Sequence, residues 1–211
     1  MRYVRAPLRV RAVAEFDAPG LFALAAAVGW ASGLRLYATV FLLGVASRFG
    51  LMELPAGLAM LEHPAVLGVS GLLLASEWLI DKIPGLDSLW DAFHALLRIP
   101  AGAALAAAIL GADGAAMATV GALLGGSLAA SSQLAKTSAR AAINTLPEPV
   151  SNIAASVTED GLTLGVLWLA VTKPAVLAAV LALLVLVSGV IVWLLLRFLR
   201  AAFSRLRPRA G

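Results

Sequence analysis

The feature that most constrains this chain is a set of apolar runs that are long enough to cross a lipid bilayer. The clearest run begins at Pro174 and ends near Leu199, and a helix needs about 20 apolar residues to span the hydrocarbon core. Of the 211 residues, 61% are hydrophobic and 13% are charged, whereas globular chains carry about 25% charged residues. This composition excludes a soluble domain and a disordered chain, and the long runs disfavour a β-barrel. The sequence therefore predicts an all-α, polytopic helical membrane bundle.

The runs predict about six transmembrane or re-entrant segments. The first, from Gly20 to Phe49, is longer than one span and contains glycine and Arg35, so we expect a kinked or broken helix. The other segments are expected at residues 64–80, 100–110, 115–130, 150–172 and 174–199. Residues 100–130 form two short spans or a re-entrant hairpin that protein shields from lipid. Close helix packing is expected at four small residues: Gly121, Gly125, Gly126 and Ser127.

Charge is concentrated at the two ends of the chain. Residues 1–17 form a basic arm with four arginines, residues 18–199 a single helical transmembrane domain, and residues 200–211 an Arg-rich tail. Basic segments accumulate on the cytoplasmic side, so we expect two cytoplasmic termini and an even number of crossings. The expected partners are the lipid bilayer and anionic headgroups at the basic termini. We expect no nucleic-acid partner, because the tail has no recognition motif. Assembly of the chain into a homo-oligomer stays an open alternative.

The segment from Glu77 to Arg98 carries the most informative polar pattern. Steps of four, three and four residues place one polar stripe along a helix, namely Asp87, Asp91, His94 and Arg98. Glu77 and Asp81 form another pair four residues apart at the end of the preceding span. One interpretation is an amphipathic helix in the membrane interface. The other is a functional cluster that relays protons or binds a divalent cation, with Asp87, Asp91 and His94 as the metal ligands.

Two adjacent acids, Glu159 and Asp160, lie near the middle of the expected helix 150–172. An intramembrane charge costs about 2.5–3.5 kcal/mol on insertion scales, so both acids need partners or water. Asn152, Ser156 and Glu159 follow one helical face, with steps of four and three residues. We therefore predict a buried polar role for these residues; the alternative is a helix that begins later and leaves the acids in a loop.

A third polar group follows one helical face in the stretch 131–149 and consists of Gln133, Lys136, Arg140 and Asn144. Lys136 or Arg140 could neutralise the two adjacent acids, or could hold an anionic headgroup or phosphate. The alternative is an exposed cytoplasmic connector. Arg35, inside the first apolar run, is expected to pair with an interior acid, or to extend toward the interface from a break near Gly33.

Five motifs cover nearly everything between the two basic ends: Ala31–Thr39, Glu77–His94, Arg98–Gly102, Pro147–Asn152 and Glu159-Asp160. A chain with these motifs resembles a family of bacterial membrane proteins catalogued as domain of unknown function 4126. The resemblance implies a multi-pass protein of the bacterial inner (cytoplasmic) membrane whose polar motifs are family features, and it supplies no substrate.

Three classes of function remain open. The favoured class is a small transporter or channel-like carrier for a cation or a proton-coupled solute, because transporters place polar residues from several helices around one site. A structural or assembly subunit without chemistry is the first alternative. The second is a membrane enzyme or lipid-phosphate handler with a carboxylate-bound metal, which is disfavoured because the chain has no nucleotide loop, nucleophile motif or cysteine. The carrier would use Glu77, Asp81, Asp87, Asp91, His94, Glu159 and Asp160.

Overall fold

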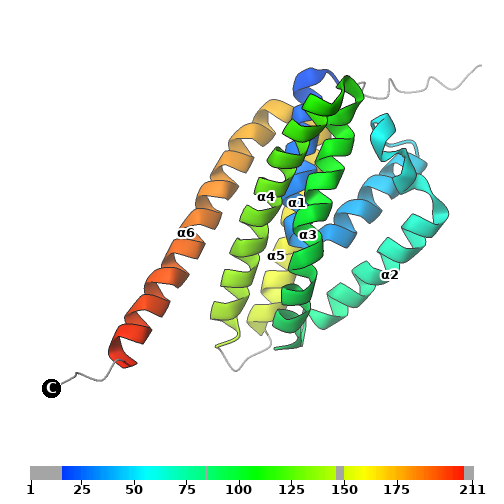
Figure 1. Ribbon diagram of the computed structural model, residues 1–211. Helices are drawn as coiled ribbons and strands as arrows, with labels where there is room; N and C mark the ends of the chain where they lie inside the picture. Colours follow the sequence, from blue (N-terminus) through cyan, green and yellow to red (C-terminus); the bar gives the residue numbers. More distant parts are fainter. Residues whose placement is uncertain (1–15, 84, 146–149, 207–211) are drawn as a thin grey trace, which may run out of the picture.

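The computed structural model describes residues 16–83, 85–145 and 150–206, and it confirms the all-α fold (Figure 1). The elements are α1 (Ala18–Arg48), η1 (Ala56–Glu62), α2 (Pro64–Ile80), α3 (Leu86–Leu110), η2 (Gly111–Asp113), α4 (Ala115–Ile143), α5 (Val150–Thr172) and α6 (Pro174–Leu206). Within this described part, five helices are long and apolar enough to cross a membrane, or six if η1 and α2, bent by 70°, form one span. The protein is a multi-pass integral membrane protein.

The helices begin where the sequence supplies starting signals. Asp17 caps α1, because its carboxylate accepts a hydrogen bond of 2.9 Å from the amide of Gly20. Pro64 and Pro174 open α2 and α6, at the position where a missing amide hydrogen costs nothing. Gly114 precedes α4 with φ at +107°, a conformation that other residues rarely adopt, so the α3/α4 turn depends on glycine.

The first and last helices place the described ends of the chain at opposite ends of the bundle (Figure 1). The start of α1 lies beside the start of α6, since Pro19 and Pro174 line one cavity, and α6 then runs to the opposite end. This arrangement favours an odd number of crossings rather than the expected even number. The prediction of two cytoplasmic termini stays untested, because residues 1–15 and 207–211 lie outside the described residues.

Helices α1, α3 and α4 meet through small residues. A Cβ atom at Gly29 of α1 would lie 2.5 Å from the Cα atom of Gly125 in α4. A Cβ atom at Gly125 would in turn lie 2.5 Å from the carbonyl oxygen of Gly102 in α3. Such distances leave no room for a side chain, so the backbones approach closely, as expected for Gly121 and Gly125.

The two central helices are longer than the apolar runs indicate. Helix α3 begins at Leu86 and continues through Pro100, and α4 continues to Ile143. Residues 100–130 are therefore parts of two long helices rather than a re-entrant hairpin. Polar residues near the ends of these helices lower the local hydropathy of the sequence. Because they face the bundle interior, the helix continues through them. The break expected in the first run lies at Arg35.

Candidate functional site

Helix α1 is interrupted near its middle at Arg35, whose backbone angles (φ −142°, ψ 76°) are not helical. Such a break disturbs the regular pairing of nearby carbonyl groups. Side chains of α4 donate to two of these carbonyls. Ser132 Oγ donates to the carbonyl of Trp30 over 2.7 Å, and Lys136 Nζ donates to that of Leu34 over 3.2 Å. Helix α4 therefore stabilises the break.

The buried guanidinium of Arg35 connects the end of α2 with α5. Its Nη1 atom lies 2.6 Å from Asp81 Oδ2, at the residue that follows α2. Its Nε atom lies 3.4 Å from Glu159 Oε2 and 3.1 Å from Asp160 Oδ1. Nη2 donates to Ser156 Oγ over 2.7 Å. Arg35 thus pairs with interior acids, and it does not extend toward the interface.

Two further cations, Arg98 of α3 and Lys136 of α4, contact neighbouring acids of α2, α3 and α5. Arg98 donates through Nη2 to Glu77 and through Nη1 to Asp91 over 2.8 Å. Lys136 Nζ lies 3.1 Å from Asp91 Oδ1 and 3.1 Å from Glu159 Oε2. Because Glu77, Asp91 and Glu159 each meet more than one cation, these contacts form a network rather than separate pairs.

Arg140 and Asn144 of α4 extend the network toward the α2/α3 turn. Arg140 Nε donates to Glu159 Oε1 over 3.2 Å, and Arg140 Nη1 donates to the backbone carbonyl of Asp81 over 3.1 Å. Asn144 Nδ2 donates to Asp87 Oδ1 over 3.0 Å. Asn144 also accepts a bond of 2.9 Å from the side chain of Asn152. Within the described residues 131–145, this face is thus not an exposed connector.

We define the ion-pair network by the ten charged residues whose side chains form these bridges: Arg35, Glu77, Asp81, Asp87, Asp91, Arg98, Lys136, Arg140, Glu159 and Asp160. Four cations face six carboxylates, so the network carries a formal excess of two negative charges. Nine of these residues are buried, and the side chain of Asp160 is 32% exposed. Burying unbalanced charge is costly, which favours the uptake of positive charge.

Helix α3 turns its polar stripe inward and its apolar face outward. Asp87, Asp91 and Arg98 are at most 1% exposed, whereas Leu89 and Phe93 are 69% and 66% exposed. A helix in the membrane interface would present its charged stripe to water. The interfacial interpretation is therefore wrong, and the apolar side is the surface suited to lipid.

The predicted metal ligands do not converge. Asp87 meets Asn144 and Arg140, and Asp91 meets Arg98 and Lys136. His94 stacks on Trp90 at 4.0 Å between ring centroids, and its Nδ1 atom lies 2.8 Å from the Trp90 carbonyl. The described residues contain no group of three or more His, Asp or Glu that could hold a metal ion. The carboxylates of Asp87 and Asp91 instead contact cations of the protein.

Several carboxylate oxygens in the network have no hydrogen-bond partner among the described residues. Glu77 Oε2, Asp81 Oδ1 and Asp91 Oδ2 are buried in this way, although the other oxygen of each group meets a cation. Asp81 lies in the α2/α3 turn, where burial raises the pKa of its carboxyl, with Lys136 and Arg35 acting in the opposite direction. The network therefore contains buried acceptor atoms that a proton could occupy.

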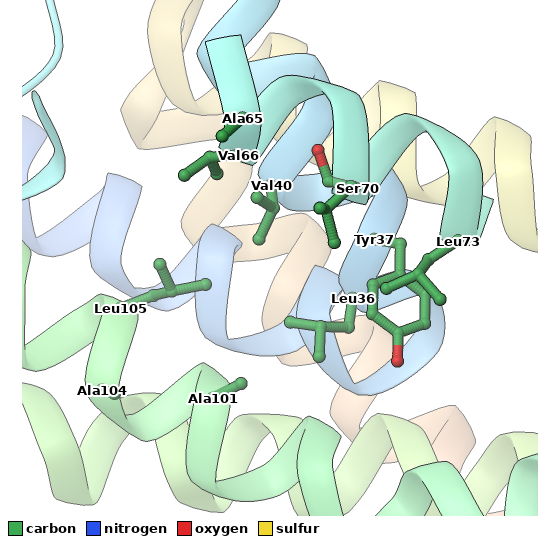
Figure 2. A pocket seen from close by; sticks show the side chains of 11 residues that line it. Leu36, Tyr37, Val40, Ala65, Val66, Ser70, Leu73, Ala101, Ala104 and Leu105 are labelled. Atoms are coloured by element: carbon green, nitrogen blue, oxygen red, sulfur yellow. The ribbon is translucent and has the colours of Figure 1, made fainter. Parts of the chain in front are cut away.

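Two cavities differ in how they meet the network. Between α1, α2 and α3, a cavity of about 560 Å³ is lined mostly by apolar side chains (Figure 2). Ser70 and Tyr37 are the lining residues that carry a hydroxyl group. Between α1, α2 and α5, a cavity of about 670 Å³ reaches Asp160 and Thr163. The second cavity therefore touches the charged interior, and the first does not.

Two further polar residues belong to this region. Gln133, predicted as part of the polar face that includes Lys136, accepts through Oε1 from Arg98 over 2.9 Å. Thr163 was not predicted; it is 1% exposed and follows Glu159 by four residues, so it extends the polar stripe of α5. Continuing the same spacing would have identified Thr163.

Apolar helices wrapped around a buried charged interior define a polytopic membrane protein built on an internal ion-pair network. Residues 22–197 match the family described as Domain of unknown function (DUF4126), and the chain belongs to that family. No curated protein and no solved structure matches the chain. The family match confirms the resemblance seen in the five motifs, and it assigns no substrate.

Proposed function

We propose that this protein is a small carrier whose ion-pair network binds and releases protons as it moves a solute. The observation that carries the proposal is the charge imbalance: six carboxylates face four cations within the bundle. In a medium of low dielectric constant, each uncompensated carboxylate favours its neutral form. The network is thus expected to bind protons and to release them when a cation approaches.

The broken helix supports the same function. Carriers commonly place discontinuous helices at their binding sites, because interrupted helices expose backbone groups near the middle of the membrane. Here the break at Arg35 adjoins acids of α2 and α5, and Glu159 is the tenth of the 23 residues of α5. Arg35 contacts Asp81 and Asp160 at the same time. A shift of its guanidinium toward one of these acids would therefore couple the two.

The alternatives lack a comparable observation. A structural subunit gains nothing from a charge excess that raises the cost of burial. A metal-dependent enzyme requires ligands that converge on one point, and the described residues hold no such group. A lipid-phosphate handler requires cations that are free to bind phosphate, whereas Lys136 and Arg140 contact carboxylates.

The test compares two glutamate substitutions in purified protein reconstituted into liposomes with an entrapped pH dye. Under an imposed membrane potential and a panel of solute gradients, the wild type should acidify the lumen, and Glu77→Gln should abolish this flux. Glu53→Gln, at an exposed loop position, is the matched control and should leave it unchanged. Infrared spectra of the wild type should show a protonated carboxyl band. If the band and the flux are both absent in the wild type, the function of a structural subunit takes precedence.

We also propose that the carrier resides in the bacterial inner membrane and that the helices α2 to α6 cross this membrane one after another, so that successive turns lie on opposite sides. Because the chain has no cysteine, single cysteines can report topology. Asp113→Cys and Lys173→Cys, in the turns after α3 and α5, should react alike with an impermeant thiol reagent in intact cells. Lys82→Cys and Thr145→Cys, in the turns after α2 and α4, should show the opposite reactivity. Equal labelling of all four would contradict a spanning bundle.

A further inference from the structure

The cavity between α1, α2 and α5 has one carboxylate in a mostly apolar lining. Its walls include Leu42 of α1, Leu74 and Trp78 of α2, and Leu164 of α5. Its volume of about 670 Å³ lies within the range of roughly 300–1,000 Å³ that is typical of small-molecule sites. An apolar pocket with a few polar groups is the usual form of such a site.

The polar groups of this cavity are the carboxylate of Asp160 and the hydroxyl of Thr163. The Asp160 side chain is 32% exposed, unlike the rest of the network, and its Oδ1 atom lies 3.1 Å from Arg35 Nε. Thr163 is 1% exposed, and its Oγ1 atom has no hydrogen-bond partner within the described part of the chain. An orphaned buried hydroxyl costs free energy, so a ligand that bonds to it would be stabilised.

We propose that this cavity binds a protonated amine with an apolar body, the ammonium group meeting Asp160 and Thr163. A charged group enters a low-dielectric site only if it is paired, and Asp160 supplies the opposite charge. The network carries an excess of negative charge, so an added cation reduces the imbalance rather than increasing it. A carboxylate ligand would have the opposite effect and would be rejected.

The ring of Trp78 supplies apolar area to this cavity. Lys82 Nζ already lies 3.0 Å from the centroid of that ring, an arrangement in which the ring face attracts positive charge. The ring therefore offers contact to the apolar body of the ligand, and the ammonium group relies on Asp160 and Thr163. The aliphatic walls from α1 and α5 would cover the remaining body of the ligand.

The role of this site in transport rests on the proposed function. An ammonium group at Asp160 competes with Arg35 for the same carboxylate, which frees the guanidinium to neutralise Asp81 more fully. The Asp81 carboxyl then holds a proton less strongly. Amine binding and proton release would thus be linked, as in an exchanger.

Binding is tested on the detergent-solubilised full chain by calorimetry, without any gradient. The probe is 3-phenylpropylamine, with 3-phenylpropan-1-ol and 3-phenylpropionate as uncharged and anionic analogues. The amine should bind at one site at least about tenfold more tightly than the alcohol, because a hydrogen bond to a charged group is the stronger contact. The carboxylate should show no binding. Equal affinities for the amine and the alcohol would overturn the assignment.

Variants then locate the site. Asp160→Asn should lower the amine affinity to that of the alcohol, while Asp113→Asn, at an exposed turn, should leave it unchanged. Ala75→Trp fills the cavity from α2 without altering the charges, and it should weaken amine binding while keeping the melting temperature. This second variant decides the matter if Asp160→Asn does not fold. Amine binding retained in the folded variants would place the site elsewhere.

The outcomes separate this site from the carrier proposal. If the amine binds but no proton movement is found in liposomes, the site stands and the carrier proposal fails. If Glu77-dependent proton flux is present but no amine binds, the carrier proposal stands and the site assignment fails.

Discussion

The two halves of the bundle use the same helices but hold them together in opposite ways. In the half that contains the α3/α4 turn, Gly29 and Gly125 bring the backbones of α1 and α4 into contact. In the half that contains the α2/α3 turn, α3 and α4 contribute Arg98 and Lys136, which bridge buried acids. One half is packed by small residues, and the other is held by charge.

This difference teaches how a small membrane protein can contain an ionised interior. Within lipid, helices gain little from the hydrophobic effect when they associate, so close packing and polar contacts must hold them. The glycine contacts fix α1, α3 and α4 against one another at one end. The charged residues at the other end are then held near their partners, which reduces the entropic cost of ordering them.

The largest effect is expected when a cation of the charged half is removed. Arg98→Met should lower the free energy of unfolding by about 3–5 kcal/mol, because Glu77 and Asp91 would remain buried with one partner fewer. Thermal unfolding in detergent, followed by circular dichroism, measures the loss. Arg48→Met, at an exposed position, is the control and should change the melting temperature little. Similar losses for the two variants would show that the network adds no stability.

The second-largest effect on stability is expected in the half of the bundle that contains the α3/α4 turn and is packed by small residues. Gly125→Ala should cost about 1–3 kcal/mol, since its methyl group would press on the backbone of α3. Gly165→Ala on α5 has no atom within 4 Å of the new methyl group and should be neutral or stabilising, because alanine favours helix by up to about 1 kcal/mol. The same melting experiment compares the two. If they behave alike, close packing is not what joins these helices.

The sequence specified the fold where the boundaries of helices coincide with changes in hydropathy. Helix α5 occupies Val150–Thr172 as expected, because proline residues lie on both sides of it. The starts of α2 and α6 were also predicted from Pro64 and Pro174. Helices α3 and α4 were underestimated, because averaging hydropathy along the chain cannot tell which face of a polar helix is buried.

The candidate site was predictable as a set of residues but not as a set of pairs. Helical spacing identified the polar stripes of α3, α4 and α5, since the period of a helix is fixed. It could not show that Arg35 meets Asp81, because that contact depends on where the break in α1 points the side chain. It also could not separate His94 from the network, because the stacking on Trp90 is a matter of side-chain conformation.

The smallest effect is expected when an acid of the charged half is neutralised, and its sign tests the charge imbalance. Burial raises the pKa of Asp81, so the folded state holds its proton to a higher pH than the unfolded state does. Stability from this group is therefore lost as the pH rises from the unfolded pKa through the folded pKa. At pH 8, Asp81→Asn should equal the wild type or exceed it by up to about 1 kcal/mol.

The difference should shrink as the pH falls below about 4 (the ordinary carboxyl pKa), where both the folded and the unfolded state hold the proton on Asp81. Melting curves across this range measure it, with Asp113→Asn as an exposed control that should follow the wild type. A large loss in Asp81→Asn at pH 8 would mean that its bridge to Arg35 outweighs the cost of burial. The six carboxylates would then be required to hold the four cations, and the charge excess would not be available for proton uptake.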